Sequence, residues 1–535
     1  MKSKRLRIPT EDVTLSAAEI AVTQTRQFQR LFYLKQLGLA HLVYPAASQT
    51  RGAHSIQCVL EATKILRALG VRDDSVEYRQ VRMAALLHDI GHIPFSHTLE
   101  DEHTILARHD RSDRVENALR PLLAELDPAD ISLVEAAIPI LGAISDNNAR
   151  GDWRADLVGN TVCADLLAYI ATDALWTGIE KRPGYYRIYE YFTIAADRLC
   201  IRLTKGGLRN DIVSAVIDLL DMRYALTERV IFHHAKCVAS AMLARAARLI
   251  RLTDDPMLLR VGDESFLDYL EQRAASASTP EALGAAHILN CLRARRLYQR
   301  VFRITRTLRD SWDESRTSGA FCKKWRDGQA VEELLQYVED AHDLPRGSLV
   351  LWCPEGRAGM KLARAQVVWD SAEGVKGPAE LRSDPVKSQF PGVHRRVDTI
   401  EQQYLDLWTF WVCLDRRFVA HAAAVVDTLQ NQIGLACDPV FVETYLKTLP
   451  GFAERTDRGK AVRATLQRLQ PRVEQSLEQQ AALDGVARVD DATILAATRA
   501  IADAEIARRA DVQRDLFTEP DVDRDSSVSD EGRKR

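Results

Sequence analysis

Apolar residues recur at helical spacing in the first part of the chain. Residues 54–69 carry an apolar stripe at three- and four-residue intervals, and Gly70 follows at a position where helices commonly end. A second stripe follows Ser75, a residue type that caps helix N-termini, and runs to the pair His88-Asp89. We predict a helix over each stripe, and we expect the second helix to end at His88-Asp89.

Two further helices are predicted downstream, over residues 161–179 and 211–251. The first carries a polar face with a four-residue repeat, formed by Asp165, Tyr169 and Asp173. No run before about residue 300 has the alternation that a strand core requires. The pattern therefore predicts an all-helical domain over residues 1–300.

The pattern changes after residue 340. Residues 347–353 and 365–370 are apolar, β-branched and aromatic between turn residues, and we predict that they pair as two strands. Residues 400–435 place aromatic side chains at helical spacing around Trp408, which predicts a helix that serves as core or as a subunit interface.

The predicted fold class is mainly α, with an all-helical core, a smaller α+β C-terminal region and a disordered tail. The predicted regions are the core domain 1–300, an accessory α+β region 301–455 with the strand pair and the aromatic helix, a helical region 456–512 and a disordered tail 513–535.

The composition is that of an ordinary globular protein: 46% of the 535 residues are hydrophobic, 27% are charged, and the formal net charge is −3. This charge predicts no large basic surface for nucleic acid, although a local basic patch stays open. No apolar run approaches the length of a membrane span and no apolar segment follows the basic N-terminus, so neither a span nor a secretory signal is expected. The nine cysteines form no CxxC pair, which predicts buried free thiols in a cytoplasmic protein.

The pair His88-Asp89 stands at the edge of a predicted core, where an imidazole and a carboxylate are costly unless something binds them. Divalent transition metals prefer such nitrogen and oxygen donors. Adjacent residues diverge by about a hundred degrees around a helix, so these two side chains can converge only at a helix end. Two more ligands must come from other helices, and the candidates are His54 and Asp165.

Four segments resemble, in order, the motifs of the HD-domain deoxynucleotide triphosphohydrolases. This family includes the bacterial dGTP triphosphohydrolases and the sterile-alpha-motif HD protein of animals. The similar segments are Gln27–Gly38 (QFQRLFYLKQLG), Tyr44–Ser55 (YPAASQTRGAHS), His88–His97 (HDIGHIPFSH) and Asp165–Asp173 (DLLAYIATD). The resemblance spans about residues 20–245 and implies that the core domain 1–300 is an HD phosphohydrolase domain.

The resemblance also implies roles for individual residues. The implied metal ligands are His54, His88, Asp89 and Asp165. The implied catalytic residues are His92 and His97, which match histidines near the α-phosphate, Glu100, which matches an acidic partner of His97, and His109, which corresponds to a later histidine of the same cluster. The implied substrate contacts are Arg51 for phosphate, Gln36 and Leu37 beside the base, Tyr169 and Asp173 at the sugar and its 3′-hydroxyl, and Arg223 as a further nucleotide contact.

Cofactors and partners follow from the same resemblance. A divalent metal (Mn, Fe, Zn or Ni) would occupy the HD site, and Mg would accompany the substrate phosphates. Water of lowered pKa would attack the α-phosphorus of a nucleoside triphosphate, and a histidine would protonate the leaving sugar oxygen. We expect a homo-oligomer without a membrane partner; a nucleotide activator and a protein partner of the C-terminal half stay open.

Three departures from the family pattern keep alternatives open. Leu166 stands where the family often has a lysine, Ile231 aligns with a tyrosine that crowds the 2′ position of the sugar, and Thr172 replaces an arginine. The alternatives are another HD phosphohydrolase, such as a nucleotide phosphatase or a cyclic- or oligonucleotide phosphodiesterase, and a nucleotide-sensing subunit with slow turnover. Tyr169 and Asp173 favour the triphosphohydrolase, because a generic HD phosphatase has no need of a sugar-reading face.

Overall fold

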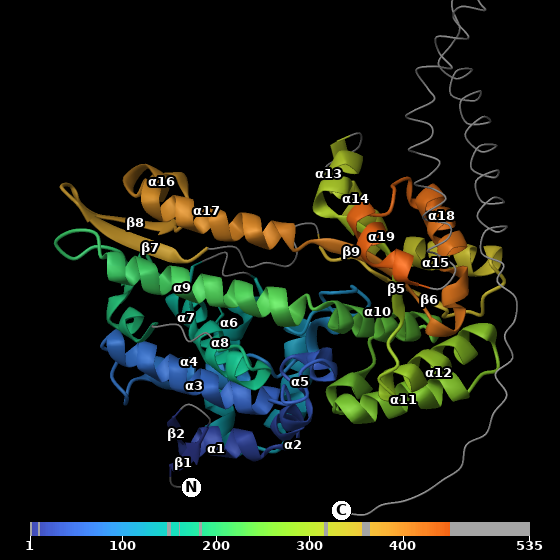
Figure 1. Ribbon diagram of the computed structural model, residues 1–535. Coiled ribbons are helices and arrows are strands. Elements are labelled where there is room, and N and C mark those ends of the chain that lie inside the picture. Colours follow the sequence, from blue (N-terminus) through green and yellow to red (C-terminus); the bar gives the residue numbers. More distant parts are fainter. Residues whose placement is uncertain are drawn as a thin grey trace, which may run out of the picture. The chain divides into compact units, whose positions relative to one another are not determined.

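The computed structural model describes residues 3–8, 11–146, 151–159, 161–180, 185–314, 319–355 and 364–449 (Figure 1). The chain divides into two units, Met1–Pro439 and Val440–Arg535, and the second is described only as far as Leu449. The predicted helical region 456–512 and the predicted tail 513–535 lie outside the described residues.

Helices dominate the N-terminal part of the first unit. They are α1 (Ala17–Gln24), α2 (Arg26–Gln29), α3 (Arg51–Ala68), α4 (Val76–Leu87), α5 (Ser112–Leu123), α6 (Pro128–Ser145), α7 (Trp153–Gly159), α8 (Ala164–Thr177), α9 (Asn210–Leu226), α10 (His234–Leu249), α11 (Asp263–Ala275) and α12 (Pro280–Arg293). Four short strands also occur, β1 (Lys4–Arg7), β2 (Asp12–Leu15), β3 (Phe192–Ala195) and β4 (Arg198–Arg202). The prediction of a mainly helical domain is confirmed, but the prediction that it contains no strand is wrong.

Helices α3 and α4 coincide with the two predicted apolar stripes. The Thr50 side chain accepts a hydrogen bond from the Ala53 amide at the start of α3, and Ser75 accepts one from the Tyr78 amide at the start of α4. Helix α4 ends with His88 as its C-cap, as the sequence predicts. Helix α3 packs on both α4 and α8, so its polar as well as its apolar residues are largely buried.

The single long helix predicted over 211–251 is wrong, because the chain forms two helices there. A π-helical turn at Thr227–Ile231 follows α9, and the backbone of His233 is outside the helical region (φ −56°, ψ 126°). The His233 side chain accepts a hydrogen bond from the Ala235 amide and thereby caps α10. Histidine is not among the residue types that commonly cap helices, so the sequence contains no signal for a break at His233. The apolar periodicity continues across the break, and for this reason the sequence predicts a single helix.

Two larger sheets follow, and the first of them joins strands of the N-terminal part to strands of the later chain. The order in one is β3-β4-β7-β8, with β7 at Gln366–Ser371 and β8 at Gly374–Glu380; the order in the other is β5-β9-β6, with β5 at Gln299–Thr305, β9 at Thr409–Leu414 and β6 at Leu349–Trp352. The two strands predicted over 347–353 and 365–370 are confirmed as β6 and β7, but their predicted pairing is wrong. β6 pairs with β9 and β7 pairs with β4, both of them remote in sequence, and β7 pairs in addition with the adjacent β8. Local pattern carries no information about the remote partners.

The aromatic helix predicted over 400–435 is also wrong in its middle. Helix α17 (Pro391–Asp406) ends before Trp408, strand β9 follows, and α18 (Ala422–Ile433) comes later. A strand that is buried on both faces has apolar residues at nearly every position. Over only six residues, such a run cannot be distinguished from the apolar positions of a buried helix. Trp408 is only 1% exposed and packs on Phe321, so it belongs to the core of its own chain rather than to an interface.

The remaining helices of the described chain are α13 (Arg306–Glu314), α14 (Ala320–Arg326), α15 (Gly328–Ala341), α16 (Asp384–Gln389) and α19 (Pro439–Thr444). All nine cysteines are buried and free, which confirms the prediction made from their spacing. Among the described helices, α6 alone has the length and the mean hydropathy, 1.4, that a membrane span requires, and 22% of it is buried. The sequence did not lead us to expect such a helix; in this structure α6 packs on α4 and α7.

Candidate metal centre

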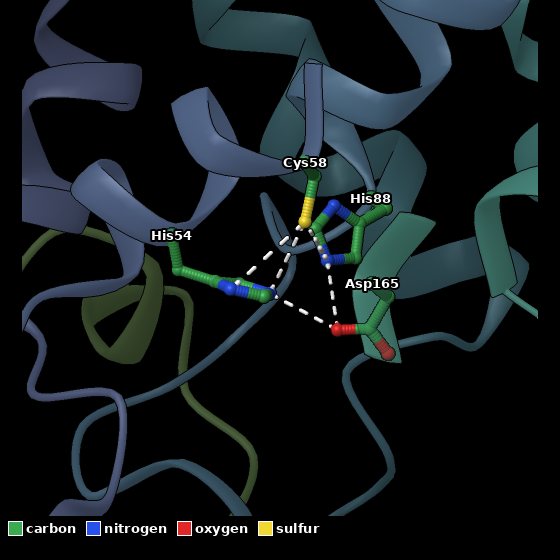
Figure 2. A group of neighbouring side chains, drawn as sticks. All are labelled: His54, Cys58, His88 and Asp165. Atoms are coloured by element: carbon green, nitrogen blue, oxygen red, sulfur yellow. Dashed lines mark hydrogen bonds and ion pairs between the residues drawn. The ribbon is translucent and has the colours of Figure 1, made fainter. Parts of the chain in front are cut away.

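Three helix ends bring the predicted metal ligands together. His54 lies in the first turn of α3, His88 caps α4 with Asp89 directly after it, and Asp165 lies in the first turn of α8. His54 Nε2 is 3.0 Å from Asp165 Oδ1, and His88 Nε2 is 3.9 Å from the same oxygen (Figure 2). Nε2 of His88 is also 3.3 Å from Asp89 Oδ1. Imidazole nitrogens and carboxylate oxygens at these separations fit the donor set of a divalent transition metal.

Neighbouring groups orient these ligands. The Nδ1 atom of His88 lies 2.8 Å from the Ala85 carbonyl oxygen, a contact that leaves Nε2 for the centre. Arg51 Nη1 donates to Asp89 Oδ2 at 2.6 Å. Burial alone would raise the pKa of the Asp89 carboxyl, but Arg51 and the imidazoles of His88 and His92 hold it well below its usual range. Asp89 is therefore an ionised carboxylate, as a metal ligand must be.

The donor side chains differ in their exposure to solvent. The His54 side chain is fully buried and that of His88 is 10% exposed, whereas the Asp165 side chain is 22% exposed. Asp165 is therefore the most exposed of these three donors.

Cys58 is a member of the centre that sequence reasoning missed. Its Sγ atom lies 3.4 Å from His54 Nε2 and 4.0 Å from His88 Nε2 (Figure 2). Burial, with Asp165 and Asp89, raises the pKa of the Cys58 thiol well above its usual value. The signal that could have found it is the four-residue spacing from His54, which places both side chains on one face of α3.

A second group of imidazoles lies beside the first. The ring of His92 stacks on that of His109 with centroids 3.5 Å apart, and the His97 ring lies 4.9 Å from that of His92. Nδ1 of His97 lies 2.9 Å from Asp101 Oδ2, whereas Glu100 Oε2 lies 2.9 Å from Nδ1 of His109. The acidic partner of His97 is therefore Asp101, one residue after the predicted Glu100, because Asp101 lies one turn beyond His97.

Gly91 allows this second group to form. A Cβ atom at position 91 would lie 2.2 Å from the His109 carbonyl oxygen, so no other residue fits without moving that segment. The close approach places His109 against His92. Burial, Arg51 and His109 lower the pKa of His92 well below its usual value, so His92 is a neutral imidazole.

The polar face of α8 lies within electrostatic range of the metal ligands. Asp173 is buried, its Oδ1 atom has no hydrogen-bond partner, and burial raises its pKa to about 8 against the opposing effect of Arg51. Burial also raises the pKa of the Tyr169 hydroxyl, while Arg223 on α9 acts in the opposite direction. Asp173 is thus a buried carboxyl able to bind a hydroxyl, whereas Tyr169, one turn earlier on α8, and Arg223 on α9 are only partly buried.

The remaining predicted substrate contacts are Arg51, Gln36 and Leu37. The Arg51 guanidinium donates hydrogen bonds to Asp89, to Ser96 Oγ at 2.8 Å and to the Gln36 carbonyl oxygen at 3.4 Å. The Oε1 atom of Gln36 is buried and without a hydrogen-bond partner, and the half-buried side chain of Leu37 packs against the core.

The three residues that depart from the family pattern differ in environment. Leu166 is fully buried, Ile231 is 38% exposed, and Thr172 Oγ1 accepts a hydrogen bond from Gln49 Nε2 at 3.2 Å. Leu166 therefore has an apolar structural role, whereas Ile231 presents an aliphatic side chain at the surface.

Comparisons with known proteins agree with this geometry. Residues 51–138 match the HD domain family. The chain is 28% identical over 302 residues to the deoxynucleoside triphosphate triphosphohydrolase SAMHD1 homolog of Dictyostelium discoideum, covering 51% of this chain and 55% of that protein. It is 25% identical over 260 residues to human deoxynucleoside triphosphate triphosphohydrolase SAMHD1, covering 42% of this chain and 41% of that protein. The chain thus spans about half the length of the curated relatives it matches, and the resemblance predicted from its motifs is confirmed.

The fold has counterparts among solved structures. A phosphohydrolase from Bacteroides thetaiotaomicron superimposes with a TM-score of 0.53 at 18% identity, covering 77% of this chain and 100% of that chain. At this identity the likeness concerns the fold alone. It extends beyond the matched HD segment to later parts of the chain.

Proposed function

We propose that this protein hydrolyses nucleoside triphosphates, preferentially deoxynucleotides, to a nucleoside and inorganic triphosphate. The observation that carries the proposal is the convergence of His54, His88, Asp89 and Asp165, the last of them on the helix that also carries the partly buried Tyr169 and the buried Asp173. The first set suits a metal that binds phosphate, and the second suits a sugar. The deoxynucleoside triphosphate triphosphohydrolase activity of the two SAMHD1 relatives supports the same substrate class.

A divalent ion held by His54, His88, Asp89 and Asp165 would supply a water of lowered pKa and a Lewis acid for a phosphate oxygen. The protein side chains account for the rest. Arg51 keeps Asp89 ionised and adds positive charge where negative charge develops on phosphorus.

His97 is the group best placed to protonate the leaving sugar oxygen. Its side chain is 45% exposed, and Asp101 accepts the Nδ1 proton, so Nε2 is left to carry a proton to substrate. The neutral, buried His92 is unsuited to donate a proton and instead orients its neighbours.

The sugar would bind against α8. Because Asp173 has a pKa of about 8, its carboxyl is mostly protonated at neutral pH and can both donate to and accept from a 3′-hydroxyl. The aromatic ring of Tyr169, four residues earlier on the same face, offers an apolar surface on which a sugar ring packs.

The test is to incubate the purified protein with Mn²⁺ or Mg²⁺ and each dNTP and NTP, and to resolve the products by chromatography. Nucleoside together with triphosphate supports the proposal. A matched pair of variants localises the activity: His97→Ala should abolish turnover, whereas His394→Ala, which removes a histidine with the same pairing to an aspartate 2.9 Å away, should not.

A second candidate function is a phosphatase or phosphodiesterase that uses the same centre. The observations that favour it are the buried, apolar Leu166 and the exposed Ile231 at positions where the family has triphosphate- and sugar-contacting residues. In the same assay, release of monophosphate or free phosphate would support this function and contradict attack at the α-phosphorus. We further propose that the protein is a cytoplasmic homo-oligomer, which sedimentation velocity and fractionation would test.

A further inference from the structure

The thiol of Cys58 occupies the buried side of the metal centre. Cys58 follows His54 by four residues on α3 and is fully buried, whereas the Asp165 side chain is 22% exposed. The donor atoms of His54, Cys58, His88 and Asp165 all lie within 4.8 Å of one another. Figure 2 shows the sulfur directed toward the two imidazole rings.

The separations of these atoms are those expected around one ion. A tetrahedral ion with a sulfur bond of about 2.3 Å and nitrogen bonds of about 2.0–2.1 Å would hold sulfur and nitrogen about 3.5 Å apart. The observed distances from Sγ, 3.4 Å to His54 Nε2 and 4.0 Å to His88 Nε2, lie on either side of that value. Sγ is also 3.9 Å from His54 Nδ1, so it is closer to Nε2 than to Nδ1 of that ring.

The fourth predicted ligand, Asp89, has a charged partner of its own. Asp89 Oδ2 is engaged by Arg51 at 2.6 Å, and Asp89 Oδ1 lies 3.3 Å from both His88 Nε2 and His92 Nε2. Arg51 and His92 are not proposed ligands, so their contacts compete with the ion for this carboxylate. An additional donor on the buried side is therefore useful to the centre.

We infer that Cys58 is a direct metal ligand, which makes this a mixed imidazole, carboxylate and thiolate centre. The inference rests on the proposed function only in that both use the same ion. Binding through sulfur forms a metal–sulfur bond and breaks the S–H bond, and the proton passes to solvent. Because thiolate ligands select Zn²⁺ and other softer ions over Mn²⁺ and Mg²⁺, the chain should prefer Zn²⁺ or Co²⁺.

The test is the absorption spectrum of the full-length protein loaded with Co²⁺. A cobalt–thiolate bond gives an intense charge-transfer band in the near ultraviolet, whereas imidazole and carboxylate ligands give only the weak visible bands. The wild-type protein should show the intense band. Cys58→Ser, which keeps the volume of the side chain, should lose it, and Cys200→Ala, which removes another buried thiol from β4, should keep it.

A second measurement compares metal affinities. Removing groups that merely orient ligands lowers metal affinity about 10- to 100-fold, so loss of a direct ligand should lower Zn²⁺ affinity by at least about 100-fold. The Mn²⁺ affinity of Cys58→Ser should change far less, because a hydroxyl suits that ion.

The outcomes separate this inference from the proposed function. One bound Co²⁺ per chain without the intense band in the wild type would overturn the inference and leave the hydrolase proposal standing. The band without nucleotide hydrolysis would uphold the inference and contradict the proposed function. Failure of the wild type to bind any of these ions would overturn both.

Discussion

Replacing Asp173 by asparagine removes one buried ionisable group with almost no change of shape. In the wild type, burial raises the pKa of this carboxyl from 3.8 to about 8. The unfolded chain therefore releases the proton near pH 4, while the folded chain keeps it until about pH 8. Since the folded state binds more protons across this window, the free energy of unfolding of the wild type falls as the pH rises from 4 to 8.

The size of the effect follows from the two pKa values. Each unit of difference corresponds to about 1.4 kcal/mol, so the wild type loses about 2 kcal/mol by pH 5 and about 4 kcal/mol by pH 7 relative to its stability in acid. The asparagine amide cannot ionise, so the variant lacks this loss. The stability of Asp173→Asn relative to the wild type should rise by about 2–3 kcal/mol between pH 5 and pH 7.

The assay is urea denaturation of the metal-free wild type and Asp173→Asn at pH 5, 6, 7 and 8, followed by tryptophan fluorescence. Asp268→Asn, which alters an aspartate whose side chain is 61% exposed on α11, is the control and should track the wild type at every pH. A constant difference between the wild type and Asp173→Asn would refute the reasoning, because Asp173 would then ionise at the same pH in both states.

Three other outcomes are expected. Asp101→Asn should lower kcat about 10²- to 10³-fold by removing the acceptor that orients His97, with Asp398→Asn on α17 as the unaffected control; equal activity in both would exclude Asp101 from catalysis. Glu19→Ala should destabilise the fold by about 3–5 kcal/mol, because it leaves the buried Arg82 guanidinium without its carboxylate; a thermal midpoint like that of the wild type would contradict this. Chelation should lower the thermal midpoint, since an ion at about 100 times its Kd adds about 2.7 kcal/mol, and re-addition of Zn²⁺ should restore it.

The positions of three donors of the candidate centre could be predicted from the sequence, because local signals show where helices begin and end. His88 follows an apolar stripe and therefore stands at a helix end, and His54 and Asp165 stand in the first turns of other helices. Helix ends are where side chains from separate helices can meet. The resemblance of four ordered motifs then selected these donors among the many histidines and aspartates of the chain.

The features that could not be predicted from the sequence depend on how the folded chain brings atoms together. Cys58 carries no motif, and only its one-turn spacing from His54 connects it with the centre. The choice between Glu100 and Asp101 as the partner of His97 depends on the backbone path of a short turn. The prediction of a helix around Trp408 was wrong because a strand buried on both faces and a buried helix have similar compositions.

Strand β4 has a consequence for the order in which the chain can fold. Its Ile201 pairs with Val367 of β7, and its Arg198 binds Asp156 of α7 at 2.6 Å. A nascent chain that has emerged only to residue 300 thus presents β4 with one open edge, a surface prone to wrong pairing. The half that carries every proposed metal ligand is completed by a segment synthesised much later, so premature termination should yield aggregation rather than a small active enzyme.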